Sequence, residues 1–568
     1  MTDPVLPNTG LPNTGADLLA ASLRAHGVTR TFGIPGTHNL PIFGGLSRYG
    51  ITNITTRHEQ GAGYAADGFA RVCGQPGVAI TTTGPAVLNI AAAVGQASSD
   101  SVPMLVVSTG LPSSYPSVPS GFLHELRGSQ QQAMSQVAAI SHRASSVAEV
   151  GVAVARAFSY FRAGRPGPAY LEIPADLLDQ CAVDARPPVA VQPEPMPPDP
   201  GPVLRAAAAL RAAAALRVTG RVAIVLGGGA WGAAADCLEL AERLGAPVVT
   251  TANGKGIVCE SHPLSVGVAL HSPAVQQWLA DCDVVVAIGT ELAESDFWRQ
   301  PPHIGRALVR IDIDAAQMYA GQPADFPMVA DARAGVRKLL CELTNQGQLE
   351  DLCERDSLER VSRDAAAVVR DLIDKRNAPT RVRDARWIPY LRALREVLAG
   401  DAVITSDSAM CCYYGALPHL PLGPRGRFVH PTGFGTLGFA LPAAIGALVA
   451  APGRQVLALS GDGGLQFTIQ ELGTAADIGK PLPIVVFDNG GYGEIRAEMT
   501  ERNQLPTSVD LKTPDLAQIS RAYGGHGCTA ATPAELRLAV QDALRTAGPT
   551  IIVINEDRTF LNTPRRLR

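Results

Sequence analysis

The chain has 568 residues, too many for one hydrophobic core, and its length fits three domains of ordinary size. Hydrophobic residues make up 46% and charged residues 18%, a balance typical of a globular enzyme and unlike a disordered or fibrous chain. The net charge of −4 includes no basic block, so no nucleic-acid partner is predicted. Ten scattered cysteines, no secretory leader and no membrane-length apolar run predict a cytoplasmic protein without a membrane partner.

The first part of the chain divides into an arm and an α/β segment. Residues 1–13 contain the string LPNTG and the start of its repeat, and we expect a flexible arm there. Residues 14–186 alternate short apolar strands with helical patterns, which favours a doubly wound parallel sheet. The predicted elements are the strands Arg30–Gly33, Gly77–Thr82 and Met104–Ser108 and the helix Glu59–Arg71. A proline-rich linker, 187–202, follows.

Two more α/β segments are predicted, at 203–344 and 387–568, with a polar connector at 345–386. The predicted elements are the helix Leu204–Leu216 and the strands Val222–Leu226, Pro247–Thr250, Val284–Ile288, Leu308–Ile313, Ala402–Ser406, Val456–Ser460, Pro483–Asp488 and Thr550–Ile554. The glycine triplet Gly227-Gly228-Gly229 fits either a nucleotide-binding turn or a plain strand-to-helix turn. A dinucleotide site would also need an acid at the end of Pro247–Thr250, which ends in two threonines.

The most informative pattern lies between Val456 and Ile495. It predicts a strand, the turn Gly461-Asp462-Gly463-Gly464, a helix at Gln466–Ile478 and a second strand that leads into Asn489. Because the strands of one βαβ unit are parallel, their carboxyl ends share one sheet edge. Asp462 and Asn489 are therefore expected to converge on a hard cation such as Mg²⁺, while the glycines let backbone N–H groups approach phosphates.

This pattern resembles the signature of thiamine-diphosphate enzymes, in which GDG is followed some twenty-five residues later by an Asn-ending pair. The resemblance implies that Mg²⁺ is held by Asp462, Asn489 and the main-chain carbonyl of Gly491. Asp488 stands where many members have the first asparagine of this pair. The second residue, Asn489, which the resemblance implies as the metal ligand, is present.

The resemblance extends to the acetolactate-synthase-like branch through RHEQGAGYAADGFAR (57–71) and HPTGFGTLGFALPAAIGA (430–447). It implies that Glu59 activates the cofactor pyrimidine, that Leu437 holds the two cofactor rings in the bent conformation, and that the Gly435 carbonyl accepts a hydrogen bond from the pyrimidine amine. The cofactor contacts implied are Ser408, Met410, Gly435, Leu437, Gly461, Asp462, Gly463, Gly464, Asn489 and Tyr492. In this family the cofactor lies between subunits, so a homodimer or homotetramer with shared sites is expected.

The reaction is expected to be decarboxylation of a 2-oxo acid to an aldehyde. Glu494 and Glu498 lie one turn apart after the metal loop, on the substrate side in this family, where two acids suit a cationic, guanidinium-bearing substrate. An equally open alternative is a solvated helix face with ion pairs to Arg496 or Arg502. The motifs GYGEIR (491–496) and LHEL (123–126) look like those of 2-ketoarginine decarboxylases.

The proton donor is not evident, because the sequence has no adjacent histidine pair; His124 is the candidate. Ser408-Ala409-Met410 replaces the Gln-His pair of acetolactate synthases. The stretch Thr290–Phe297 lacks the acid-and-arginine signature of their FAD site, which argues against FAD. Three rivals remain open: an acetolactate-type carboligase, a cofactor-binding subunit without activity, and a nucleotide-dependent oxidoreductase.

Overall fold

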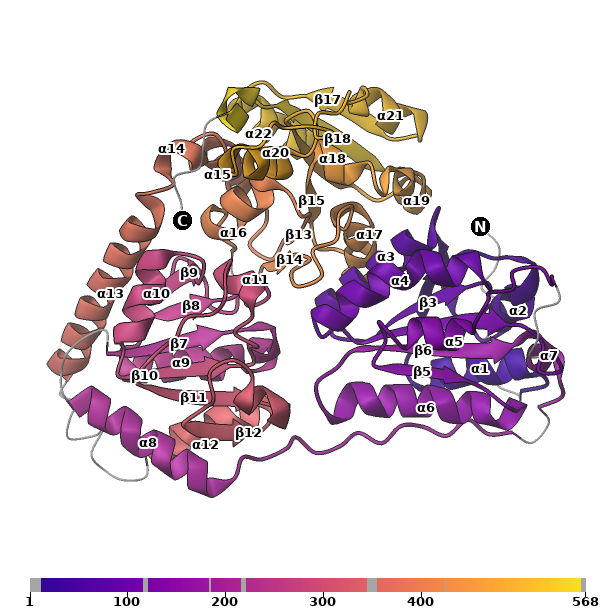
Figure 1. Cartoon of the computed structure of the whole chain (residues 1–568), viewed down its shortest axis with the longest axis horizontal. Coiled ribbons are helices and arrows are strands. Elements are labelled where there is room, and N and C mark those ends of the chain that lie inside the picture. The colour runs from indigo at the N-terminus through magenta and orange to yellow at the C-terminus, as the bar shows by residue number, and fades with distance from the viewer. Residues whose placement is uncertain are drawn as a thin grey trace.

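The computed structural model describes residues 12–115, 121–182, 185–215, 221–344, 355–423 and 425–562. It contains three six-stranded sheets, one in each of three lobes that follow one another along the chain (Figure 1). Every strand pair is parallel, and helices cover the sheets, so the prediction of three doubly wound α/β domains is confirmed. Of the expected arm, only residues 12 and 13 lie within the described ranges. No helix in those ranges is long and apolar enough to cross a membrane.

The first sheet has the strand order β2-β1-β3-β4-β6-β5. Every residue of its two central strands is buried and most are apolar, as expected for parallel strands covered on both faces. Its strands are β1 (Arg30–Gly33), β2 (Thr52–Thr55), β3 (Gly77–Thr81), β4 (Met104–Gly110), β5 (Ile140–Arg143) and β6 (Pro168–Pro174). Its helices are α1 (Gly15–Ala25), α2 (Leu40–Arg48), α3 (Glu59–Cys73), α4 (Pro85–Ser99), α5 (Gln130–Met134), α6 (Val147–Ala163) and α7 (Ala175–Asp179).

The second sheet has the order β12-β11-β10-β7-β8-β9. An extended segment joins it to the first lobe along the lower edge of Figure 1. Its strands are β7 (Val222–Leu226), β8 (Val248–Thr250), β9 (Ser265–Val268), β10 (Val284–Ile288), β11 (Ala307–Asp312) and β12 (Phe326–Val329). Its helices are α8 (Pro200–Ala215), α9 (Ala234–Leu244), α10 (Pro273–Asp281), α11 (Glu294–Phe297) and α12 (Ala332–Thr344).

The third sheet has the order β14-β13-β15-β16-β18-β17, and the long helix α13 (Arg355–Asn377) leads up to it. Its strands are β13 (Val403–Ser406), β14 (Arg427–Val429), β15 (Val456–Gly461), β16 (Leu482–Asp488), β17 (His526–Thr529) and β18 (Pro549–Asn555). Its helices are α14 (Arg381–Asp384), α15 (Ile388–Val397), α16 (Leu417–His419), α17 (Ala440–Ala450), α18 (Asp462–Leu465), α19 (Leu472–Ile478), α20 (Gly493–Glu501), α21 (Leu516–Ala522) and α22 (Pro533–Ala543).

The single helix predicted at Gln466–Ile478 is wrong, because the segment is broken. A short helix, α18, begins at Asp462 itself, and α19 begins only at Leu472. Between them Thr468 leaves helical geometry and donates its hydroxyl to the carbonyl of Gly438 at 2.6 Å. The predicted cap is present, since Gly479 ends α19 in the left-handed conformation.

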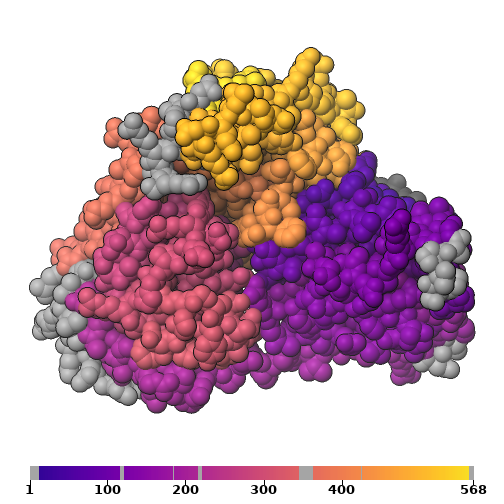
Figure 2. Space-filling model, viewed as in Figure 1, coloured from indigo at the N-terminus to yellow at the C-terminus, as the bar shows by residue number. Residues whose placement is uncertain are grey.

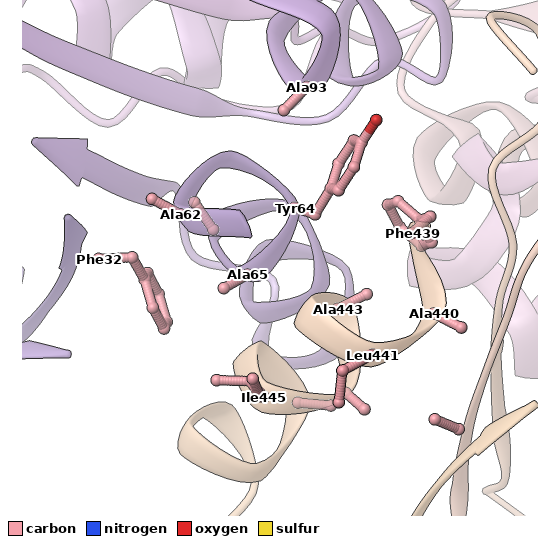
Figure 3. Packing of buried hydrophobic residues seen from close by; sticks show 14 of the residues in the cluster. Phe32, Ala62, Tyr64, Ala65, Ala93, Phe439, Ala440, Leu441, Ala443 and Ile445 are labelled. Carbon is pink, nitrogen blue, oxygen red and sulfur yellow. The ribbon is translucent and has the colours of Figure 1, made fainter. Parts of the chain in front are cut away.

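The surfaces of the first and third lobes touch in Figure 2. The two lobes meet through α3 and α17, which cross at close range (Figure 3). Small residues make this approach possible, because a methyl group on Gly446 would overlap the carbonyl oxygen of Ala65. The ring of Tyr64 packs edge-on against that of Phe439, with centroids 5.3 Å apart. The helix that begins at Glu59 is therefore fixed to the lobe that carries Asp462.

Candidate functional site

Asp462 and Asn489 meet where two neighbouring strands end. Strands β15 and β16 pair in parallel with Gly461 opposite Phe487, so the residues that follow them lie side by side. The carboxylate of Asp462 accepts the N–H of Asn489 at 3.2 Å and the hydroxyl of Thr513 at 2.9 Å. Asp462 and Asn489 are both buried, with 1% and 9% of their surfaces exposed, respectively.

The groups at this edge fit a hard cation. The amide oxygen of Asn489 is buried and has no hydrogen-bond partner among the described residues, which calls for a ligand there. The carbonyl oxygen of Gly491 lies 3.0 Å from where a methyl group on Gly463 would be, so it faces the glycine turn. A carboxylate, an amide oxygen and a backbone carbonyl are oxygen ligands of the kind that Mg²⁺ accepts. The assignment of Asp462, Asn489 and Gly491 as ligands stays a prediction.

The electrostatics of this edge also favour a bound cation. Burial and the neighbouring carboxylate of Asp488 raise the pKa of Asp462 to about 6. A divalent ion beside Asp462 would favour the ionised form and oppose both effects. Asp488 itself accepts the N–H of Gly490 at 2.9 Å and lies 3.7 Å from the Arg558 guanidinium.

A carboxylate that sequence reasoning missed, Asp407, joins three cofactor segments. It follows β13 and is 1% exposed. One oxygen accepts the N–H groups of Ser408 and Gly438, both at 2.9 Å, and the other accepts the hydroxyl of Ser460 at 3.0 Å. Asp407 thus links the predicted diphosphate contacts at Ser408, the loop of Leu437 and the strand that ends at the metal edge.

The remaining predicted cofactor contacts surround this edge. Ser408 and Leu437 are half-buried, Gly435 is exposed with a φ of +64°, and Met410 is buried. After Met410 the chain forms a π-helical turn, Cys411–Ala416, a rare geometry that is frequent at functional sites. The ring of Tyr492 lies 3.3 Å from where a methyl group on Gly463 would be.

Glu59 is the first residue of α3 and is half-buried. Its carboxylate accepts the side-chain amide of Asn89 at 2.9 Å. The preceding N–H groups of Arg57 and His58 donate to Glu471 of the third lobe, which is fully buried. No hydrogen bond or ion pair joins Glu59 to Asp462 or Asn489 within the described part of one chain.

The two acids predicted on the substrate side differ in their surroundings. Glu494 is half-buried and accepts the hydroxyl of Tyr414 at 2.8 Å. Glu498 lies one turn later, 44% of its side chain is exposed, and it faces Arg502 at 3.4 Å. Glu498 thus has the ion-paired, solvated character of the alternative interpretation. The other predicted residue, His124, lies after β4, and its Nδ1 is 3.0 Å from the hydroxyl of Thr83.

A cavity of about 660 Å³ lies between the three lobes, and none of the predicted cofactor contacts lines it. It includes the glycine triplet, but the N–H groups of Gly227 and Gly229 already donate to backbone carbonyls at 3.0 Å. They are therefore not free to hold a phosphate. Its charged lining residues are Asp100, Glu291, Glu294, Asp296, Asp312 and Asp331 against Arg71, Arg165 and Arg427. This acidic excess does not fit the phosphates of FAD or a dinucleotide.

Comparison with known proteins gives three family models in chain order. The N-terminal binding domain of thiamine pyrophosphate (thiamine diphosphate) enzymes matches residues 13–139, their central domain 209–339 and their C-terminal binding domain 409–554.

Curated relatives align along nearly the whole chain. A probable 2-ketoarginine decarboxylase of Pseudomonas aeruginosa is 36% identical over 96% of this chain and 94% of its own length. An acetolactate synthase large subunit of Parasynechococcus marenigrum is 32% identical over 96% and 88%, and a probable one of Methanocaldococcus jannaschii 31% over 95% and 91%. With relatives of this similarity and a matching model for each of its three lobes, the chain belongs to the family of thiamine-diphosphate-dependent enzymes.

Proposed function

We propose that the protein decarboxylates a 2-oxo acid to an aldehyde, with thiamine diphosphate and Mg²⁺, and prefers a substrate with a guanidinium tail. Asp462, Asn489 and the Gly491 carbonyl would hold the cation, and the glycine turn 461–464 would admit the diphosphate. When bound, thiamine diphosphate supplies the electron sink for cleavage beside the ketone. Glu59 would hold the pyrimidine ring and promote removal of the proton that activates the cofactor.

The observation that carries the guanidinium preference is the setting of Glu494. Glu494 is the second residue of α20, directly after the metal loop, and the hydroxyl of Tyr414 orients its carboxylate at 2.8 Å. The ring of Tyr414 already stacks a guanidinium, that of Arg383, whose central carbon is 3.9 Å from the ring centroid. The ring of Trp298 meets Tyr414 edge-on at 5.2 Å. A fixed carboxylate beside aromatic faces suits a planar cation.

The relative named as a probable 2-ketoarginine decarboxylase supports the same substrate class. The relatives named as acetolactate synthases support a second candidate, carboligation of two 2-oxo acids. Incubation with pyruvate alone separates the two, because a carboligase gives acetolactate and a decarboxylase gives acetaldehyde.

The substrate test compares 2-ketoarginine with 2-oxopentanoate, which has the same carbon chain without the guanidinium. We expect Glu494→Gln to lower kcat/KM for 2-ketoarginine by roughly 10- to 100-fold, the value of a hydrogen bond to a charged group, and to leave 2-oxopentanoate unchanged. Glu498→Gln is the matched control on the same helix and should change neither by more than about threefold. Equal use of both substrates by the wild type would refute the guanidinium preference.

The proposal includes a homodimer or homotetramer whose sites lie between subunits, with Glu59 of one chain facing the metal edge of another. Each of the variants Glu59→Gln and Asp462→Ala should be inactive alone. After subunit exchange in an equal mixture, half of the dimers would be mixed and each would hold one intact site, so roughly a quarter of full activity should return. A mixture that stays inactive after proven exchange would contradict shared sites.

A further inference from the structure

Two histidines that are far apart in the sequence lie together in the first lobe. His38 belongs to the short turn Thr37–Asn39 after β1, and His124 lies in the loop after β4. Their ring centroids are 5.1 Å apart and the rings meet edge-on at 67°. The pairing is absent from the linear sequence, which contains no adjacent histidines.

The pair lies on the same sheet edge as Glu59. Strands β2, β1, β3 and β4 are consecutive neighbours in this parallel sheet, so the segments after them leave from one edge. Glu59 follows β2, His38 follows β1, Thr83 follows β3 and His124 follows β4. The two imidazoles therefore lie along the same sheet edge as Glu59, the residue that is expected to activate the cofactor.

The backbone holds His124 in a strained conformation. Its φ is +67°, in the left-handed region that side chains other than glycine rarely adopt. The hydroxyl of Thr83 anchors the ring of His124 at Nδ1, 3.0 Å away, so Nε2 is the ring nitrogen that Thr83 does not bond. Gly84 makes room for it, since a methyl group there would lie 2.7 Å from the His124 carbonyl oxygen. Such strain persists only where surrounding contacts impose it, and it is frequent at functional sites.

His38 contributes an unsatisfied polar atom to the pair. Its Nδ1 is buried and has no hydrogen-bond partner within the described ranges of the chain. An unpaired buried nitrogen is rare and is explained where a substrate or water completes its bonding. Burial, and then repulsion by His124, lower the pKa of His38.

We propose that His38 and His124 together form the proton donor of the aldehyde-forming step, an inference that rests on the proposed decarboxylation. When the bond between the ketone carbon and the carboxylate breaks, CO₂ leaves and the electron pair stays on the former ketone carbon. That carbon then takes a proton from an imidazolium of the pair and forms the C–H bond of the aldehyde. The imidazole regains its proton from water, so no oxidant or further reactant is needed.

The test separates CO₂ loss from aldehyde release in the holoenzyme, with 2-ketoarginine as substrate. His124→Asn suits the test because asparagine tolerates the left-handed backbone and can still bond Thr83. We expect this variant and His38→Asn each to slow aldehyde release about 100-fold, the usual share of an acid catalyst, while CO₂ release in a single turnover changes less than about threefold. The double variant should be no slower than the slower single one, because the two rings act as a unit.

An added dye such as 2,6-dichlorophenolindophenol reports the step before protonation, since it removes the electron pair and makes the proton donor unnecessary. Dye-coupled turnover of both variants should match the wild type within about threefold, a result that damage to the fold would not give. His142→Gln, on the edge strand β5 of the same lobe, is the control and should release aldehyde normally. Normal aldehyde release by both variants, or an equal fall in CO₂ and aldehyde, would overturn the inference. Failure of the wild type itself to release CO₂ would instead refute the proposed function.

Discussion

Replacing Asp407 by alanine should loosen the loop of Leu437 from the strand that ends at the metal edge. The carboxylate is the common acceptor for the N–H groups of Ser408 and Gly438 and for the hydroxyl of Ser460. Alanine removes these bonds, and a longer one from the N–H of Phe439, at once and adds no acceptor. Asparagine is nearly the same shape, so its oxygen can keep both N–H groups and its amide can donate to Ser460.

The size of the effect follows from the groups left unpaired. A buried donor without an acceptor costs about 1–3 kcal/mol. The hydroxyl of Ser460 can turn to the carbonyl of Gly461, 3.2 Å away. The N–H groups of Ser408 and Gly438 remain without an acceptor, and the N–H of Phe439 loses a weaker bond of 3.4 Å to the same oxygen. Their cost of roughly 2–6 kcal/mol is reduced because burial of the Asp407 carboxyl, whose pKa is raised, also ends. We expect a net loss of about 2–4 kcal/mol for alanine and less than about 1 kcal/mol for asparagine.

Hydrogen exchange in the cofactor-free protein measures this local loss without assuming that three lobes unfold in one step. The segment 432–439 should exchange about 30- to 1,000-fold faster in Asp407→Ala, because each 1.4 kcal/mol is tenfold, and near the wild-type rate in Asp407→Asn. Calorimetry with Mg²⁺ should show weaker thiamine diphosphate binding for alanine only. Thr405→Val, which removes another buried bond of β13, is the control. Wild-type exchange in Asp407→Ala, or equal acceleration in both variants, would refute the reasoning.

Three further outcomes follow from other parts of the structure. Asn489→Leu should lower Mg²⁺-dependent binding of thiamine diphosphate at least about tenfold by calorimetry, because it removes the unpaired amide oxygen; unchanged binding would exclude that oxygen as a ligand. Gly446→Ala should destabilise the contact of α3 with α17 by about 1–3 kcal/mol in thermal unfolding, whereas Gly232→Ala, which meets nothing within 4 Å, should not. Burial raises the pKa of Asp296 to about 7, so its stabilising contribution is complete only below the ordinary carboxyl pKa of 3.8 and is lost as pH rises from there through 7; Asp296→Asn should then unfold at a higher temperature than the wild type at pH 9 but not at about pH 4.

The sequence was most informative where one residue type has a single physical use. Buried parallel strands need continuous apolar runs, and the predicted strands Val222–Leu226 and Val284–Ile288 match β7 and β10 residue for residue. Glycines around one acid mark a turn that a ligand approaches, which led to Asp462. The two glutamates predicted on the substrate side could not be told apart, because acids one turn apart look alike in sequence, whereas in the structure Glu494 accepts a tyrosine hydroxyl and Glu498 faces Arg502.

What the sequence could not reveal depends on contacts between distant segments. Asp407 looks like any acid after a strand, and its role arises only because Gly438 and Ser460 fold against it, 31 and 53 positions away. The break in the predicted helix has the same origin, since Thr468 bonds the loop of Leu437 instead of continuing a turn. Local periodicity records which face is apolar, whereas a polar side chain that bonds a remote backbone leaves no periodic signal.

The histidine pair shows why a motif search and a structure can disagree about a proton donor. Adjacent histidines in a chain would be one way to bring two imidazoles together, but parallel strand order offers another, since neighbouring strands deliver their following loops to one edge. His38 and His124 are separated by 86 positions and still meet at 5.1 Å, because β1 and β4 flank β3. In such folds the residues to compare between related enzymes are those that follow successive strands, whatever their spacing in sequence.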